Sequence, residues 1–199
     1  MKKILLNRHS IRLTKFDYSQ GGHYFVTVCT YNRKCLFGNA VGGIMELNEW
    51  GKIAVECWNK IQERFPNVEL DEYVVMPNHV HGIVRIVGAT LVVAPCAVAQ
   101  HESPGTVKRA GTRPAPTWDV PPQVGARPVT LGQIIAAFKS MVVHRCIDGV
   151  KQNKLPPFHE KIWQRNYYDH VIRNEKSLHQ IRQYILDNPS QWETDPENV

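Results

Sequence analysis

Apolar residues recur along this chain with two periods, and the alternation between these periods predicts the order of the secondary structure. Segments rich in apolar and β-branched residues predict four strands, at residues 23–30, 68–76, 79–87 and 161–172. The second and third strands are joined only by a Met-Pro-Asn corner, so we expect them to pair in antiparallel orientation. The fourth is expected to have an irregular middle.

Three other segments place apolar residues at the spacing of one helix face. Each follows a residue whose side chain can cap a helix N-terminus: Asn48, Thr130 and Asn174. The first helix is expected to stop at Pro66. The third is expected to finish near Asn188, because Pro189 disfavours helical geometry in the residue before it.

The resulting order is strand, helix, strand, strand, helix, strand, helix, which is typical of ferredoxin-like α+β folds. We therefore expect a single domain over residues 1–199, with an antiparallel sheet and helices packed on one face. The last helix is expected to meet His79 and His81 on the other face.

Residues 88–129 interrupt this order, because they show no apolar period and hold seven of the 13 prolines. A structureless stretch of this length is unusual inside a domain, so it is interpreted as a long, mobile Pro/Gly-rich insertion.

Glycines mark two further features of the chain. The cluster from Gly38 to Gly43 predicts a loop. Gly82, in mid-strand, indicates close approach of a ligand or backbone, or else a bulge.

Composition narrows the class of protein. Hydrophobic residues make up 43% and charged residues 21%, and no stretch nears the roughly 20 apolar residues of a membrane helix. The first residues lack the apolar run of a signal peptide, so a cytoplasmic protein without membrane contact is expected. The five scattered cysteines argue against a disulfide framework and against a cysteine zinc site. The net charge of +6 fits a nucleic-acid partner but is common among soluble proteins.

Two histidines make the first candidate for chemistry. His79 and His81 are two residues apart in a predicted strand, so their imidazoles point to the same side and can share one ion. The alternative is that they are ordinary surface residues.

A second candidate lies on the last helix, where Tyr184 and Asn188 are four apart and project from one face. A tyrosine next to a bound cation can attack a phosphodiester, and the Asn188 carbonyl can be a further ligand. The alternatives are that Tyr184 is half-buried packing and that Asn188-Pro189 only ends the helix.

The corner Pro77-Asn78-His79-Val80-His81 is similar to the histidine–hydrophobe–histidine (HUH) motif of single-tyrosine transposases. Further segments resemble REP-associated tyrosine transposases, which are bacterial proteins linked to repetitive extragenic palindromes. These segments are residues 10–13, 17–19, 24–30, 163–174 and 184–189. Together the similar segments span nearly the whole chain outside 88–129.

The resemblance implies a ferredoxin-like fold, a Mg²⁺ or Mn²⁺ cofactor, and cleavage and rejoining of single-stranded DNA next to hairpins through a 5′-phosphotyrosine. His79 and His81 match the histidines of the motif, and Tyr184 matches the catalytic tyrosine. Asn188 takes the position of a third metal ligand, which in relatives is often glutamine. Insertion-sequence relatives are dimers that exchange the tyrosine helix, whereas REP-associated ones resemble monomers, so both states stay open.

DNA is expected to be bound through phosphate contacts and through base stacking. The candidates for phosphate contacts are Arg12, Arg33, Lys34, Lys139, Arg145 and Arg165. Tyr167 and Tyr168 are candidates for stacking and rivals to Tyr184 as nucleophile, although core packing is an equal alternative. Each basic residue also has the simpler interpretation of a solvated surface charge.

Three hypotheses about function follow. The first is a metal-dependent tyrosine transposase acting on hairpin DNA. The second is an inactive or domesticated hairpin-binding regulator of the same fold. The third is a metal-dependent hydrolase of a small substrate, which the absence of a carboxylate in the histidine motif disfavours.

Overall fold

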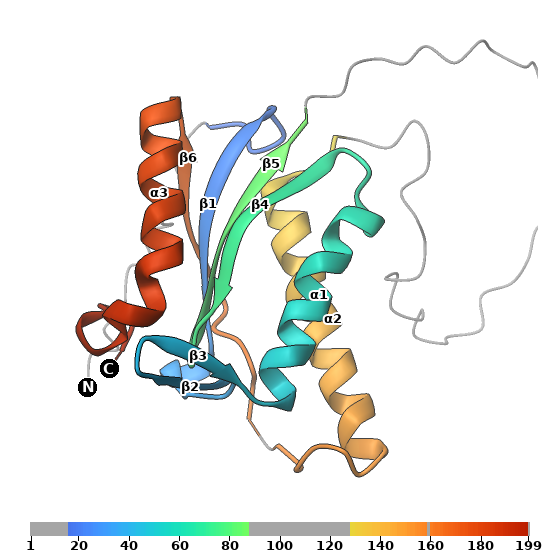
Figure 1. The fold of residues 1–199 in the computed structure, drawn as a ribbon. Helices are drawn as coiled ribbons and strands as arrows, with labels where there is room; N and C mark the ends of the chain where they lie inside the picture. The colour runs from blue at the N-terminus through green and yellow to red at the C-terminus, as the bar shows by residue number, and fades with distance from the viewer. Residues whose placement is uncertain (1–15, 88–127, 159, 199) are drawn as a thin grey trace, which may run out of the picture.

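The computed structural model describes residues 16–87, 128–158 and 160–198 (Figure 1). The strands are β1 (Gly22–Cys29), β2 (Gly38–Val41), β3 (Ile44–Leu47), β4 (Val68–Val75), β5 (His79–Ile86) and β6 (Tyr168–Ile172). The helices are α1 (Glu49–Arg64), α2 (Leu131–Lys151) and α3 (Glu175–Asp187), with short 3₁₀ helices η1 (Tyr31–Arg33) and η3 (Asn188–Thr194). Arg12 and nearly all of the expected insertion at 88–129 lie outside the described residues.

The main sheet has the strand order β4-β5-β1-β6, and every neighbouring pair is antiparallel. Together with the helix order this is the ferredoxin-like arrangement, and the predicted α+β fold class is confirmed. Figure 1 shows α1 and α2 side by side on one face of the sheet and α3 on the opposite face. The two expected helix layers are therefore separated by the sheet.

Local sequence signals explain where the helices begin. The side chains of Asn48 and Asn174 accept hydrogen bonds from backbone N–H groups three residues on, as N-caps do. Thr130 forms a capping box with Gln133. All three predicted caps are confirmed, and α3 ends at Asp187, next to the predicted end at Asn188.

The alternation of side chains along the strands divides the core in two. Under α1 and α2 lies the larger cluster, which includes Val26, Val80 and Trp58. Under α3 lies a smaller cluster of buried residues: Phe25, Ile83, Ile172, Leu178 and Ile185. His79 and His81 alternate with Val80 and so face α3. A slip of one residue in the register of β5 would turn them away from it.

The glycine cluster at 38–43 does not form the predicted loop, and this prediction was wrong. Residues Gly38–Val41 and Ile44–Leu47 pair as a hairpin. Its turn is Gly42-Gly43, with φ of 57° and 80°, values that favour glycine and suit a tight hairpin turn. The apolar residues on either side, Val41 and Ile44, were the signal for a hairpin.

The last predicted strand is shorter than expected. Only Tyr168–Ile172 pairs with β1 as a strand, while the preceding residues are irregular apart from a bridge between Trp163 and Thr30. The role of Gly82 also differs from prediction: a Cβ there would collide with the indole of Trp58, so the glycine admits a core side chain from α1. A bulge does occur, between Leu70 and Tyr73 on the neighbouring strand β4.

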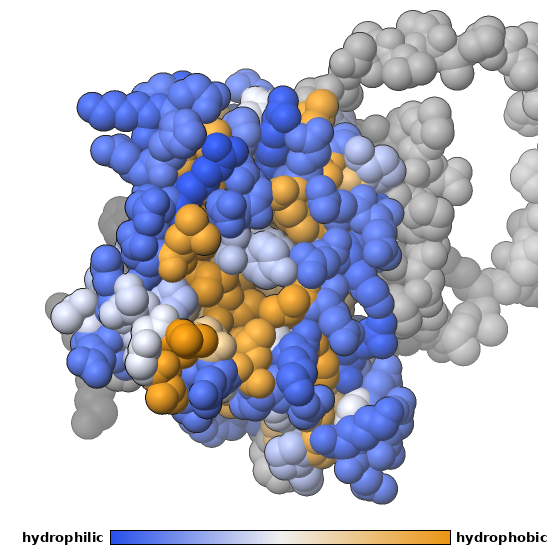
Figure 2. All heavy atoms as spheres, viewed as in Figure 1, coloured by the Kyte–Doolittle hydropathy of each residue, from blue (hydrophilic) through white to orange (hydrophobic). Residues whose placement is uncertain are grey.

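The surface follows the layers of the fold. Figure 2 shows hydrophilic side chains over the outer faces of α1 and α3, and hydrophobic side chains reaching the surface between these helices. No helix in the described part of the chain combines the length and apolar character needed to cross a membrane.

Candidate metal and nucleophile site

The two histidines form the floor of the site. Both are almost fully buried, with 0% of His79 and 2% of His81 exposed. Their ring centroids are 4.3 Å apart, on the α3 face of β5. The structure therefore excludes the interpretation of the pair as ordinary surface residues.

Burial keeps both rings neutral. It lowers the pKa of His79 to about 4, and together with the neighbouring His79 it lowers the pKa of His81 well below its ordinary value. A neutral imidazole has one nitrogen lone pair available, which is the form that binds a metal. Two buried neutral imidazoles side by side are thus suited to a shared cation.

Tyr184 reaches this floor from α3. Its hydroxyl oxygen is 3.3 Å from Nε2 of His81, although the two residues are 103 positions apart in the chain. The side chain is 38% exposed, so the phenol borders both the buried histidines and solvent. Burial, followed by the nearby Asp195 and Glu197, raises the pKa of the phenol, which is therefore protonated at neutral pH.

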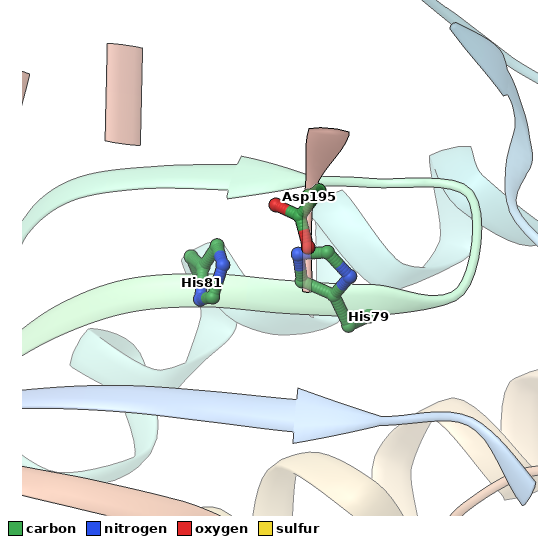
Figure 3. A group of neighbouring side chains, drawn as sticks. All are labelled: His79, His81 and Asp195. Carbon is green, nitrogen blue, oxygen red and sulfur yellow. The ribbon is translucent and has the colours of Figure 1, made fainter. Parts of the chain in front are cut away.

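Asn188 and Asp195 complete the cluster. Possible ligand atoms of His79, His81 and Asp195 all lie within 4.8 Å of one another, and Figure 3 shows the Asp195 carboxylate close to the two rings. The Asn188 amide donates to Asp195 Oδ2 at 2.7 Å. Sequence reasoning found Asn188 and missed Asp195.

Two buried atoms in the cluster have no hydrogen-bond partner among the described residues: Nε2 of His79 and Oδ1 of Asn188. The nearby Asn188 amide acts to raise the pKa of His79 and to lower the pKa of Tyr184. Its oxygen is nevertheless not placed to form a hydrogen bond with either side chain. Unpartnered buried acceptors are costly, and a cation bound between them would satisfy both.

The carboxy-terminal segment is tied down beside the histidines. Glu197 forms an ion pair with Arg33 at 3.0 Å and accepts a hydrogen bond from the Cys29 thiol at 3.3 Å. Its backbone carbonyl accepts from the Asn78 amide at 2.7 Å. These contacts hold Asp195 in place. They could not be predicted from residue spacing, because they form only once η3 folds the chain back after Pro189.

The expected DNA-binding residues are dispersed. Arg33 pairs with Glu197 and Lys34 with Glu160, both near the site end of the sheet. The Lys139 ammonium donates to the backbone carbonyls of Gln164 and Asn166, and burial lowers its pKa to about 8.

Arg145 is exposed on α2, across the sheet from the histidines, and Arg165 is exposed before β6.

The two candidate tyrosines before and at the start of β6 lie in different surroundings. Tyr167 packs against the larger core cluster, with Lys139 Nζ 6.0 Å from its ring centroid. Tyr168 is 49% exposed and pairs with Thr27, which places it on the same face as His81 but two strands away.

The fold is shared with a solved transposase. The structure matches that of a REP-associated tyrosine transposase bound to a REP hairpin, with a TM-score of 0.54 and 18% identity, over 91% of this chain and 74% of that one. The chain thus has the fold that its sequence resemblance implies.

A relative with clear sequence similarity is an uncharacterized protein of Haemophilus influenzae. It is 36% identical over 189 residues, which are 95% of this chain and 92% of that protein. The chain belongs to the same family as this Haemophilus protein. No family model matches the chain.

Proposed function

We propose that this protein is a single-tyrosine transposase-type nuclease and strand transferase, which cleaves and rejoins single-stranded DNA next to hairpins. The observation that carries the proposal is the position of the Tyr184 hydroxyl, 3.3 Å from a histidine of a buried possible metal cluster. The solved transposase of the same fold is bound to a REP hairpin, which supports hairpin DNA as the substrate class.

The donor set fits a divalent cation such as Mg²⁺ or Mn²⁺. His79, His81, Asn188 and Asp195 would hold it, offering two imidazole nitrogens, an amide oxygen and a carboxylate. The carboxylate and amide oxygens are ligands that suit Mg²⁺ and Mn²⁺. A cation held by these residues would supply positive charge near Tyr184, which would favour the phenolate and offset the charge that develops during transfer.

Tyr184 performs the covalent step. Its phenolic oxygen forms a bond to phosphorus while the bond from phosphorus to the 3′ oxygen breaks, and the electron pair leaves with that oxygen. The phenolic proton passes to solvent, which the partly exposed side chain contacts, and the departing 3′ oxygen gains a proton. The products are a 5′-phosphotyrosine and a free 3′-hydroxyl.

Rejoining is the reverse of this step. A 3′-hydroxyl attacks the phosphotyrosine and Tyr184 leaves, so the energy of the original linkage is retained and no ATP is consumed. The buried side chains of His79 and His81 keep water away from one side of the phosphotyrosine bond. Attack by a DNA hydroxyl is therefore favoured over attack by water.

The experiment is an adduct assay with hairpin oligonucleotides that carry randomised loops and single-stranded flanks, in the presence of Mn²⁺. We expect label at the 3′ end to become protein-linked and label at the 5′ end to be released with a 3′-hydroxyl. Tyr184→Phe should abolish the adduct while hairpin binding survives, and Tyr168→Phe should retain it.

Adduct at normal yield in the Tyr184→Phe variant would place the nucleophile elsewhere, first at Tyr168. Tight hairpin binding without any adduct, in Mn²⁺ or Mg²⁺, would favour a hairpin-binding regulator instead.

A further inference from the structure

Asn78 lies between the first histidine and the carboxy-terminal segment. Its side chain is buried, with 1% of the residue exposed. The amide nitrogen donates to the backbone carbonyls of Glu197 and Arg33, at 2.7 and 3.2 Å. The amide oxygen is 2.8 Å from Nδ1 of His79.

These contacts determine which nitrogen of His79 carries the proton. The two carbonyl oxygens can only accept, so the NH₂ group of Asn78 must face them and its oxygen must face His79. That oxygen also can only accept, so Nδ1 of His79 must be the donor. A metal binds only an imidazole nitrogen that carries no proton, so with the proton on Nδ1 the ligand atom is Nε2, and this is the atom without a partner in the cluster.

We propose that Asn78 is the positioning residue of the metal site. It fixes His79 in the tautomer whose Nε2 can bind a cation, and through Glu197 it holds the segment that carries Asp195. One amide thus prepares a ligand from β5 and a ligand from the end of the chain. This inference rests on the proposed function only in assigning a metal to the cluster.

The backbone around Asn78 supports the role. Its carbonyl accepts from both the backbone N–H and the hydroxyl of Thr30, at 2.8 and 2.9 Å, so the corner before β5 is fixed at the end of β1. The side chain has little freedom to leave His79. Loss of the amide removes the only acceptor that the described residues offer to Nδ1 of His79, so the proton is free to move to Nε2 and block it.

The test uses two readouts without DNA. Nitrogen-15 NMR of the metal-free protein reports which imidazole nitrogen of His79 is protonated, and titration with Mn²⁺ alone reports affinity. We expect wild-type protein to carry the proton on Nδ1. In Asn78→Ala we expect mixed protonation and an Mn²⁺ dissociation constant about 10–100-fold higher, as for loss of other residues that orient metal ligands.

Asn78→Asp separates the two roles, because its carboxylate still accepts from Nδ1 but cannot donate to the two carbonyls. We expect the Nδ1 proton to be retained and the affinity to fall less than in Asn78→Ala. This variant also decides the matter if Asn78→Ala does not fold. The matched control is Asn48→Ala, which removes an amide that donates to the backbone carbonyl of Leu36 and accepts from the backbone N–H of Gly51, instead of contacting His79 or Glu197.

Wild-type tautomer and Mn²⁺ affinity in a folded Asn78→Ala protein would overturn the inference, as would an Nε2-protonated His79 in the wild type. Failure to form a DNA adduct would instead contradict the proposed function, since neither readout here involves DNA.

Discussion

The hydroxyl of Tyr184 and Nε2 of His81 are held 3.3 Å apart with the help of one hydrophobic side chain, Phe25. The Phe25 ring centroid is 5.2 Å from that of His81 and 6.1 Å from that of Tyr184, which it meets edge to face. Phe25 is buried on β1 in the cluster beneath α3. Packing on a neighbouring strand therefore supports the geometry of the proposed nucleophile.

Phe25→Leu tests this support. An apolar replacement of smaller size should lower the free energy of unfolding by about 1–2 kcal/mol. We expect the rate of adduct formation to fall about tenfold or more, because small displacements of reacting groups are costly. Single-turnover adduct assays and urea unfolding measure the two effects. Phe138→Leu, the same change in the other cluster, should lower stability without this loss of rate; equal rates in the two variants would contradict the role.

A second relationship anchors the helix that carries Tyr184. Arg182 makes two parallel hydrogen bonds to Asp71, from Nε at 2.9 Å and from Nη2 at 2.6 Å. Asp71 lies at the bulge of β4, where the extra residue alters the strand pairing. We expect Asp71→Ala to reduce the free energy of unfolding by about 1–3 kcal/mol, as for loss of a bidentate charged pair.

The matched control for this change is Glu69→Ala. Glu69 also lies on β4 and pairs with Arg85, but both side chains are about half exposed, so the loss should stay below about 1 kcal/mol. Denaturant unfolding of both variants measures the difference. Equal losses would show that the Asp71–Arg182 pair gives no special stability.

The same pair should make stability depend on pH. Burial alone raises the pKa of Asp71, but hydrogen bonds from Arg182 and from the backbone of Glu72 outweigh it, so the net pKa lies below the ordinary 3.8. A lowered folded-state pKa gives stability that is present above 3.8 and is lost as the pH falls through the folded-state value. The difference in stability between wild type and Asp71→Ala should therefore be constant near pH 7 and shrink on acidification below about 4. A difference that grows on acidification would contradict the assignment.

Much of the fold could be predicted because its signals are local. The caps at Asn48, Thr130 and Asn174 and the apolar stripes between them fix the three helices, and the two-residue spacing of His79 and His81 puts them on one face. Tyr184 and Asn188 could be placed together for a similar reason, since one turn of a helix separates them, and the structure brings both to the histidines.

What could not be predicted depends on contacts between distant parts of the chain. Asp195 reaches the site only because η3 folds back and Glu197 binds Arg33 and Asn78, and no periodic pattern records this. The irregular residues before β6 are held by tertiary bonds such as those from Lys139, which override the strand-like composition.

Gly82 gives a prediction that separates packing from ligand binding. Because a Cβ at this position would collide with Trp58, Gly82→Ala should lower the free energy of unfolding by about 1–3 kcal/mol. Combined with Trp58→Leu, which makes room, the loss should be smaller than the sum of the two single losses. Additive losses in denaturant unfolding would show that Gly82 serves another purpose.

Asp195 gives the sharpest prediction about the metal. Asp195→Asn keeps an oxygen that can accept from the backbone N–H of Glu197, and its new NH₂ group can donate to Asn188 if the Asn188 amide turns its oxygen toward it. The change therefore removes the one carboxylate of the cluster while the segment should stay in place. Affinity for hard cations follows the number of charged ligands, and we expect the Mn²⁺ dissociation constant to rise at least about tenfold. Titration with Mn²⁺ measures this, and Glu193→Gln, which removes an exposed charge from the same segment, should leave it unchanged. Unaltered Mn²⁺ affinity in Asp195→Asn would show that the cation is held by His79, His81 and Asn188 without it.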